Sequence, residues 1–87
     1  MISIDLSGKT ILITGALGAI AEHMVRRLAA TGATLVLTDI KSEEEGTRTL
    51  NGWQIPPSSY LYFSADITDS NQMERVANAA FELRKTT

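Results

Sequence analysis

Three short apolar runs recur along the chain, and each is followed by a loop and a stretch with helical periodicity. The runs lie at Lys9–Thr14, Thr34–Thr38 and Tyr60–Ala65. The centre of the first run, Ile11 to Ile13, is apolar without alternation, which is typical of a strand covered on both faces in a parallel sheet. Tyrosine, leucine and phenylalanine in the third run favour β structure. The pattern therefore predicts three strands.

The stretch Ala19–Ala30, between the first two runs, has the periodicity of an amphipathic helix. Its apolar stripe comprises Ile20, Ala21, Met24, Val25 and Leu28. The opposite face carries His23, Arg26, Arg27 and Ala30. Gly32 supplies a C-terminal stop, because glycine readily adopts the left-handed conformation that ends helices. We expect this helix to pack its apolar stripe on the sheet.

Two further helices are expected, and one of them is weaker than the other. Asp69 is placed to cap the last helix, and Gln72, three residues on, completes a capping-box pattern. The apolar stripe of that helix comprises Met73, Val76, Ala77, Ala80 and Phe81. Residues 42–52 predict a shorter helix capped by Ser42, although Gly46 and two threonines weaken it.

The alternation of strands and helices predicts the fold class. A loop at Pro56–Ser59 leads into the third strand. Right-handed crossovers should join the strands into a parallel sheet. We expect an α/β fold, a Rossmann-like three-stranded parallel sheet with flanking helices, which is an incomplete doubly wound fold. The usual doubly wound order has the first strand in the middle, so a sheet of only three strands leaves that strand at an edge.

The composition excludes several classes of protein. The 87 residues are 44% hydrophobic and 21% charged, ordinary values for a globular domain that argue against disorder. There is no cysteine and only one histidine, so neither a disulfide scaffold nor a metal site is expected. The net charge of −2 lacks the basic excess of a protein that binds nucleic acid.

The apolar stretch from Ile11 to Ala21 resembles the core of a signal peptide that ends in small residues. Asp5 offsets the charge of Lys9 before it, so the positively charged start is missing, and Thr14 interrupts the run. No run approaches the roughly 20 apolar residues of a membrane helix. We therefore expect a cytoplasmic protein with no membrane partner.

The segment Thr14–Ala21 lies where the first strand ends and the first helix begins. A dinucleotide site needs small residues there: one for a tight turn, one for close approach of the pyrophosphate, and one for helix–strand packing. Gly15 fits the first role, one residue further upstream than in the common spacing, and Gly18 and Ala21 fit the other two. The positive end of the helix would then bind phosphate.

Asp39 ends the second strand, close to the roughly 20-residue offset of the acidic residue that binds the adenosine ribose in such sites. A carboxylate at this position can accept hydrogen bonds from both ribose hydroxyls. It would also repel a 2′-phosphate. The sequence therefore predicts a site for NAD, preferred over NADP.

The motifs together resemble those of the short-chain dehydrogenase/reductase family over nearly the whole chain. Leu6–Lys9 resembles the family's L-x-G-K lead into the first strand, and Ala65–Asp69 resembles its D-V-T/D element. The glycine turn looks like the family's TGxxxGxG or TGxxGxxG. The second form fits better, because only its last glycine is replaced, by Ala21. The first form would also place Ala19 at a glycine position and crowd the phosphate.

The resemblance implies a set of cofactor contacts. The turn would hold the pyrophosphate, largely through backbone groups of Gly15, Leu17, Gly18 and Ile20. Asp39 would bind the ribose. Adenine would be flanked by Ile40 and contacted by Asp66 and Ile67.

The family's catalytic residues have no counterpart in this sequence. They are a serine, a Tyr-x-x-x-Lys pair and usually an asparagine, all beyond the third helix of the family. Tyr60 and Tyr62 have no lysine four residues on and are expected to pack in the core, and His23 is expected on the solvated surface. The resemblance implies the NAD-binding portion of a short-chain oxidoreductase, which transfers hydride between nicotinamide and an alcohol or ketone. This chain alone is expected to be inactive.

Residues 1–87 are therefore interpreted as the N-terminal dinucleotide-binding portion of a single Rossmann domain. The centre of the first strand, Ile11–Ile13, carries no charge or proline of the kind that protects a sheet edge, so a partner for this strand is expected. That partner is either the remainder of a parent protein or a second copy of the chain. The alternative function is a non-catalytic nucleotide-binding or assembly module, a homo-oligomer that pairs through the first strand.

Overall fold

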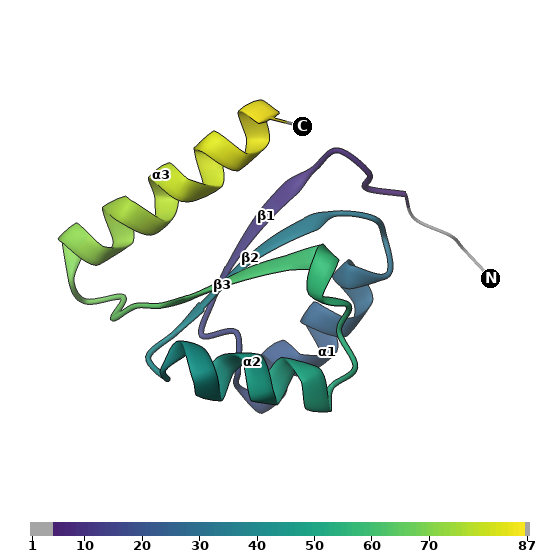
Figure 1. Ribbon diagram of the computed structural model, residues 1–87, viewed down its shortest axis with the longest axis horizontal. Coiled ribbons are helices and arrows are strands. Elements are labelled where there is room, and N and C mark those ends of the chain that lie inside the picture. The colour runs from purple at the N-terminus through teal and green to yellow at the C-terminus, as the bar shows by residue number, and fades with distance from the viewer. Residues whose placement is uncertain (1–4, 87) are drawn as a thin grey trace.

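The computed structural model describes residues 5–86, with side chains described up to residue 82. Figure 1 shows strands and helices in alternation. The elements are β1 (Thr10–Thr14), α1 (Ala19–Ala29), β2 (Thr34–Asp39), α2 (Glu43–Gly52), η1 (Pro57–Ser59), β3 (Tyr60–Ser64) and α3 (Ser70–Thr86). The predicted bounds of the three strands and of the first two helices are confirmed to within one residue. The loop expected at Pro56–Ser59 contains the short 3₁₀ turn η1.

The three strands form one parallel sheet in the order β1-β2-β3. Ile13 of β1 pairs with Leu37 of β2, and Leu37 pairs with Tyr62 of β3. The predicted fold class is confirmed, and β1 lies at an edge as expected. The central strand β2 is the most deeply buried, with Leu35, Val36 and Leu37 all at 0% exposure.

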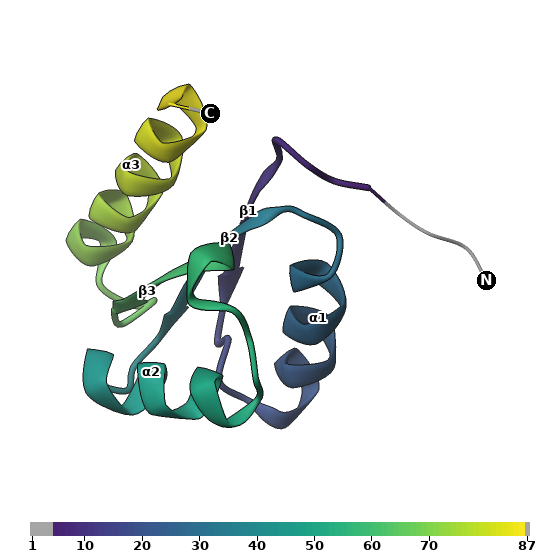
Figure 2. The ribbon, with the colours of Figure 1, turned by 45° about the vertical axis from the view of Figure 1, so that its right-hand side comes forward.

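Helices cover both faces of the sheet, with α1 and α2 on one face and α3 on the other (Figure 2). Successive residues of a strand point to opposite faces, and two core clusters follow from this alternation. The cluster on the α1/α2 face comprises Ile13, Ala16, Val25, Ala33, Leu35, Leu37, Leu50 and Ile55. The smaller cluster on the α3 face comprises Val36, Ala65 and Val76. The sheet therefore sits between two apolar layers.

The expected stripe on α1 is only partly buried. Val25 is fully buried and Leu28 packs against the core, but Ile20 is 88% exposed and Met24 is 49% exposed. The buried face is shifted toward Ala29, which also packs on the core. The physical reason is that no other element in the described part of the chain lies against the Ile20 side of α1.

The expectation that β1 is covered on both faces is likewise met only in part. Ile13 is buried, but Leu12 on the other face is 39% exposed. Only α3 lies on that face among the described elements. That helix packs against β1 and still leaves Leu12 partly exposed. On α3, Val76 is buried whereas Phe81 is 50% exposed.

Candidate functional site

A groove of about 210 Å³ lies beyond the carboxyl ends of the three strands. Its lining residues are Gly15, Asp39, Ile40, Ala65, Asp66 and Ile67. Gly15 follows β1, Asp39 ends β2, and the Ala65–Ile67 segment follows β3. Ligands of open α/β sheets bind in this crevice, outside the carboxyl ends of the strands. Five of the predicted contact residues therefore meet in one groove, and Ala65 was missed by the sequence reasoning.

The turn between β1 and α1 is shaped by two glycines with different roles. Gly15 has φ +62°, a left-handed conformation in which a residue with a side chain would be strained. The N–H of Ala16 donates to the Thr38 carbonyl at 3.0 Å, which ties the turn to β2. Gly18 has φ −75°, and an added Cβ there would meet only the Gly15 oxygen, at 3.6 Å. The fold therefore needs glycine at Gly15, whereas Gly18 leaves an open approach to the helix.

The first turn of α1 begins immediately after Gly18. The Glu22 N–H donates to the Gly18 carbonyl at 3.0 Å and forms the first helical bond, and Gly18 contributes no side-chain cap. Within the described residues, the N–H groups of Ala19, Ile20 and Ala21 have no acceptor. Free N–H groups and the positive end of the helix dipole favour an anion at this position.

The carboxylate of Asp39 links the glycine turn to the loop after β2. Its Oδ2 accepts a hydrogen bond from the Leu17 N–H at 3.2 Å, and its Oδ1 accepts one from the Ile40 N–H at 2.7 Å. These bonds orient the carboxylate at the groove. The Leu17 N–H, predicted to face pyrophosphate, is thus engaged with Asp39 in this structure.

The carboxylate of Asp66 is held by the turn that follows β3. Its Oδ1 accepts hydrogen bonds from the Thr68 N–H at 2.9 Å and the Thr68 hydroxyl at 2.7 Å. These two bonds lower the pKa of Asp66 below its ordinary value. Its Oδ2 accepts no bond from any described residue. Asp66 is therefore an ionised group with one oxygen open to a donor on a ligand.

Gln72 connects Asp66 to the cap of α3. Asp69 caps the helix as predicted, because its Oδ1 accepts from the Gln72 N–H at 3.1 Å. The capping box differs from the usual reciprocal form. The Gln72 side chain accepts from the Asp66 N–H at 2.9 Å, while the Asp69 N–H donates to the Asp66 carbonyl. The cap thereby fixes the backbone at Asp66, and its hydrogen bonds lower the pKa of Asp69.

The remaining predicted residues lie near the groove or away from it. Leu17, Gly18 and Ile20 belong to the turn and the start of α1 and do not line the groove. Tyr60 and Tyr62 pack against the core as expected. His23 is exposed on α1, also as expected.

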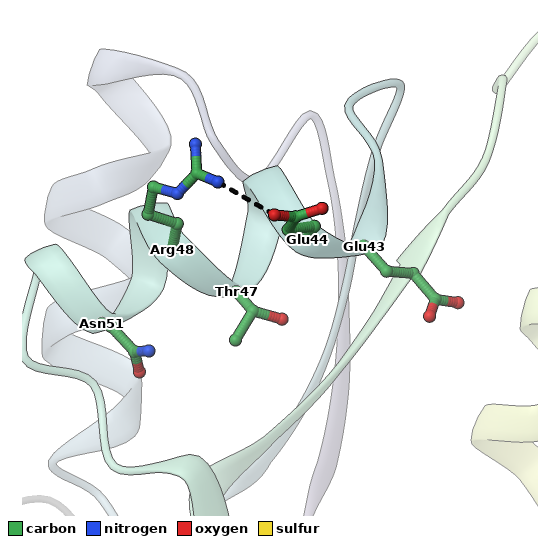
Figure 3. A pocket seen from close by; sticks show the side chains of 5 residues that line it. All are labelled: Glu43, Glu44, Thr47, Arg48 and Asn51. Atoms are coloured by element: carbon green, nitrogen blue, oxygen red, sulfur yellow. Dashed lines mark hydrogen bonds and ion pairs between the residues drawn. The ribbon is translucent and has the colours of Figure 1, made fainter.

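A second hollow, of about 510 Å³, lies on the outer face of α2 (Figure 3). It is lined by Glu43, Glu44, Thr47, Arg48 and Asn51, all from that one helix. Arg48 pairs with Glu44 at 3.2 Å, with both side chains largely exposed. An exposed pair of this kind contributes little to stability, and no second element among the described residues closes the hollow. The groove at the strand ends is therefore the stronger candidate.

Comparison with known proteins identifies the family. The model of the short chain dehydrogenase family matches residues 9–85. The chain belongs to the short-chain dehydrogenase family. This is an oxidoreductase family, and its members of known structure share the Rossmann-like arrangement described above.

Relatives of known structure and a curated relative are all much longer than this chain. A short-chain dehydrogenase/reductase (glucose/ribitol dehydrogenase) from Brucella melitensis has a TM-score of 0.79 and 27% identity, covering 93% of this chain and 32% of its own. A short-chain dehydrogenase/reductase from Burkholderia phymatum, solved in complex with NAD, has a TM-score of 0.72 and 28% identity. The match covers 94% of this chain and 28% of the Burkholderia chain. The oxidoreductase UcpA of Escherichia coli K12 is 55% identical over 40 residues, 46% of this chain and 15% of UcpA.

The present chain thus spans about a third or less of these relatives. Across the residues that the structure describes, no helix has the length and apolar character that crossing a bilayer requires.

Proposed function

We propose that this chain binds the adenosine diphosphate half of NAD, as the N-terminal portion of the Rossmann domain of a short-chain oxidoreductase. One observation carries the proposal. A single groove at the strand ends joins two oriented carboxylates, Asp39 and Asp66, and opens beside a helix start whose N–H groups are free. The NAD bound to the Burkholderia phymatum relative supports the choice of cofactor class.

The pyrophosphate would lie at the start of α1. The backbone N–H groups there offer donors, and Gly18 presents no side chain in front of them. Gly15 gives the turn its shape, and Leu17 holds Asp39 through its N–H. Ile20 would contribute its backbone N–H, because that group has no acceptor among the described residues.

The adenosine would lie across the groove. Asp39 would accept hydrogen bonds from the ribose hydroxyls, and the free oxygen of Asp66 would accept one from the adenine amino group. Ile40 and Ile67 are 73% and 61% exposed at the groove. Exposed apolar side chains beside polar groups are what a flat base can cover. The residues present therefore fit the cofactor.

The chemistry of the whole protein is proposed to be hydride transfer between nicotinamide and an alcohol or ketone, with NAD supplying the hydride acceptor or donor. The described residues of this chain contribute binding and orientation to it. No pair of tyrosine and lysine four residues apart occurs in the sequence, so this chain alone is proposed to be inactive.

Further chain is proposed to complete the domain. Leu12 on the edge strand and Ile20, Met24 and Phe81 on the helices are 39–88% exposed, and relatives of known structure are about three times longer. Additional strands beside β1 would bury these side chains. A second copy that pairs through β1 is the alternative, and light scattering of the purified protein distinguishes a monomer from a dimer.

The cofactor preference tests the proposal. NADH and NADPH are titrated by fluorescence into the purified protein and into Asp39→Asn, with Glu44→Gln as a control of equal charge change on the outer face of α2. The wild type should prefer NADH by about 10-fold or more, because a 2′-phosphate with roughly two charges about 4 Å from a carboxylate is repelled by about 2 kcal/mol even in water. Asp39→Asn should narrow the preference and Glu44→Gln should not. Equal or tighter binding of NADPH by the wild type would contradict the role of Asp39.

A further inference from the structure

The Asp39–Lys41 segment, which forms one wall of the groove, is held from behind by side chains of β3. The Tyr62 hydroxyl donates to the Lys41 carbonyl at 2.6 Å and lies 3.3 Å from the Asp39 carbonyl. The Ser64 hydroxyl lies 3.5 Å from the Ile40 carbonyl. Among these contacts from β3, the bond from Tyr62 to the Lys41 carbonyl is the shortest.

The Tyr62 ring is itself held in place by α2. Gly46, a buried residue of that helix, faces the ring. A Cβ at Gly46 would overlap the ring, at 2.5 Å from Cζ and 2.7 Å from Cδ2. Glycine inside a helix is destabilising relative to alanine, and the close approach of the ring gives its presence a packing reason. The packing of the Tyr62 ring against Gly46 therefore places the Tyr62 hydroxyl next to the Asp39–Lys41 segment.

Tyr62 does not line the groove, whereas Asp39 and Ile40 do. Burial raises the pKa of the Tyr62 hydroxyl to about 12, and the nearby charge of Asp39 adds to the shift. The hydroxyl thus remains a donor throughout the range in which cofactor binding is measured. Any effect of this hydroxyl on a ligand in the groove must pass through the backbone of the Asp39–Lys41 segment.

We propose that Tyr62 is a positioning residue that sets the preference between NADH and NADPH by holding Asp39 at the groove. This inference rests on the proposed function. Without the bond to Lys41, the segment gains conformations in which the Asp39 carboxylate has left its place. NADH then loses an acceptor for its ribose, while NADPH escapes repulsion of its 2′-phosphate. The two affinities move toward each other.

The test compares Tyr62→Phe with Tyr60→Phe on the same strand. The Tyr60 hydroxyl makes no hydrogen bond with any described residue, so this control removes the same atom without releasing the loop. For Tyr62→Phe, the Kd for NADH should rise about 3- to 10-fold, as expected when the binding-competent fraction falls by that factor. The ratio of the Kd for NADPH to that for NADH should fall at least about 3-fold. Tyr60→Phe should leave the ratio unchanged.

The ratio of affinities is the deciding readout, because partial unfolding lowers the number of sites without changing the ratio. Gly46→Ala, which displaces the ring, is a second variant and should lower the ratio in the same direction. If the wild type binds NADH and both Tyr62→Phe and Gly46→Ala keep its ratio, Tyr62 is merely structural and the inference is wrong, while the proposed function stands. If the wild type binds neither nucleotide, the proposed function fails and the inference fails with it.

Discussion

Replacing the two glycines of the β1–α1 turn by alanine should have two different effects. Gly18→Ala should weaken cofactor binding at nearly unchanged stability, whereas Gly15→Ala should lower the stability of the fold. Gly18 has φ −75° and ψ 161°, an extended conformation open to alanine, and the new Cβ would make one ordinary contact at 3.6 Å. Alanine restricts the conformations of the unfolded chain more than glycine does, which stabilises the folded protein by about 0.4–1 kcal/mol. Alanine is also a poorer N-cap than glycine, which offsets a similar amount. The free energy of unfolding of Gly18→Ala should therefore stay within about 0.5 kcal/mol of wild type.

Binding should respond far more strongly than stability. A methyl group at Gly18 would stand in front of the free N–H groups of α1, where the pyrophosphate is proposed to lie. Losing hydrogen bonds to a charged group costs about 1.5–3 kcal/mol, so the Kd for NADH should rise by about 10- to 100-fold. Urea denaturation and fluorescence titration of the same preparation measure the two effects.

Gly15→Ala is the matched control. Its φ of +62° should make this variant less stable by about 1–2 kcal/mol, even though no atom lies within 4 Å of the added Cβ. If Gly18→Ala binds NADH as well as wild type, or if it is destabilised as much as Gly15→Ala, the two glycines do not have these separate roles.

Two further predictions concern the fold rather than the cofactor. Burial, with the charges of nearby carboxylates, raises the pKa of Tyr62 to about 12 in the folded protein, against 10.0 for the free group. The folded state therefore binds this proton more tightly, and the stability it contributes is present below pH 10 and lost as the pH rises toward 12. The difference in unfolding free energy between wild type and Tyr62→Phe should shrink over that range, and a constant difference would contradict the shift. Leu37→Ala, at 0% exposure, should cost about 2–5 kcal/mol, whereas Ile20→Ala, at 88% exposure, should cost about 0.5 kcal/mol or less. Equal losses in chemical denaturation would show that Ile20 is covered in solution.

The strands and the position of Asp39 were predictable because they depend on local pattern. Consecutive apolar residues mark β2, and the strand ends where Asp39 begins the polar loop. Parallel strands bring their carboxyl ends to one edge of a sheet, so Asp39 and Asp66 had to meet there once the strands were placed.

Features that depend on tertiary neighbours were not predictable in the same way. The apolar stripe on α1 predicts that Ile20 packs on the sheet, but the exposure of Ile20 depends on which elements pack beside the helix. From the sequence alone, Gly46 indicates a weak α2, because the Tyr62 ring that packs against it belongs to a strand 16 residues later. The capping-box pattern predicts that Gln72 serves the Asp69 cap, whereas its bond to the Asp66 N–H depends on the turn after β3.

A crystal structure of the protein with NADH would show whether the groove at the strand ends holds the cofactor. The adenosine ribose hydroxyls should lie within about 2.6–3.2 Å of the Asp39 carboxylate, and the pyrophosphate should lie at the start of α1. The adenine should lie between Ile40 and Ile67, beside Asp66. Nucleotide bound away from the strand ends, or with its ribose out of reach of Asp39, would show that this groove is not the cofactor site.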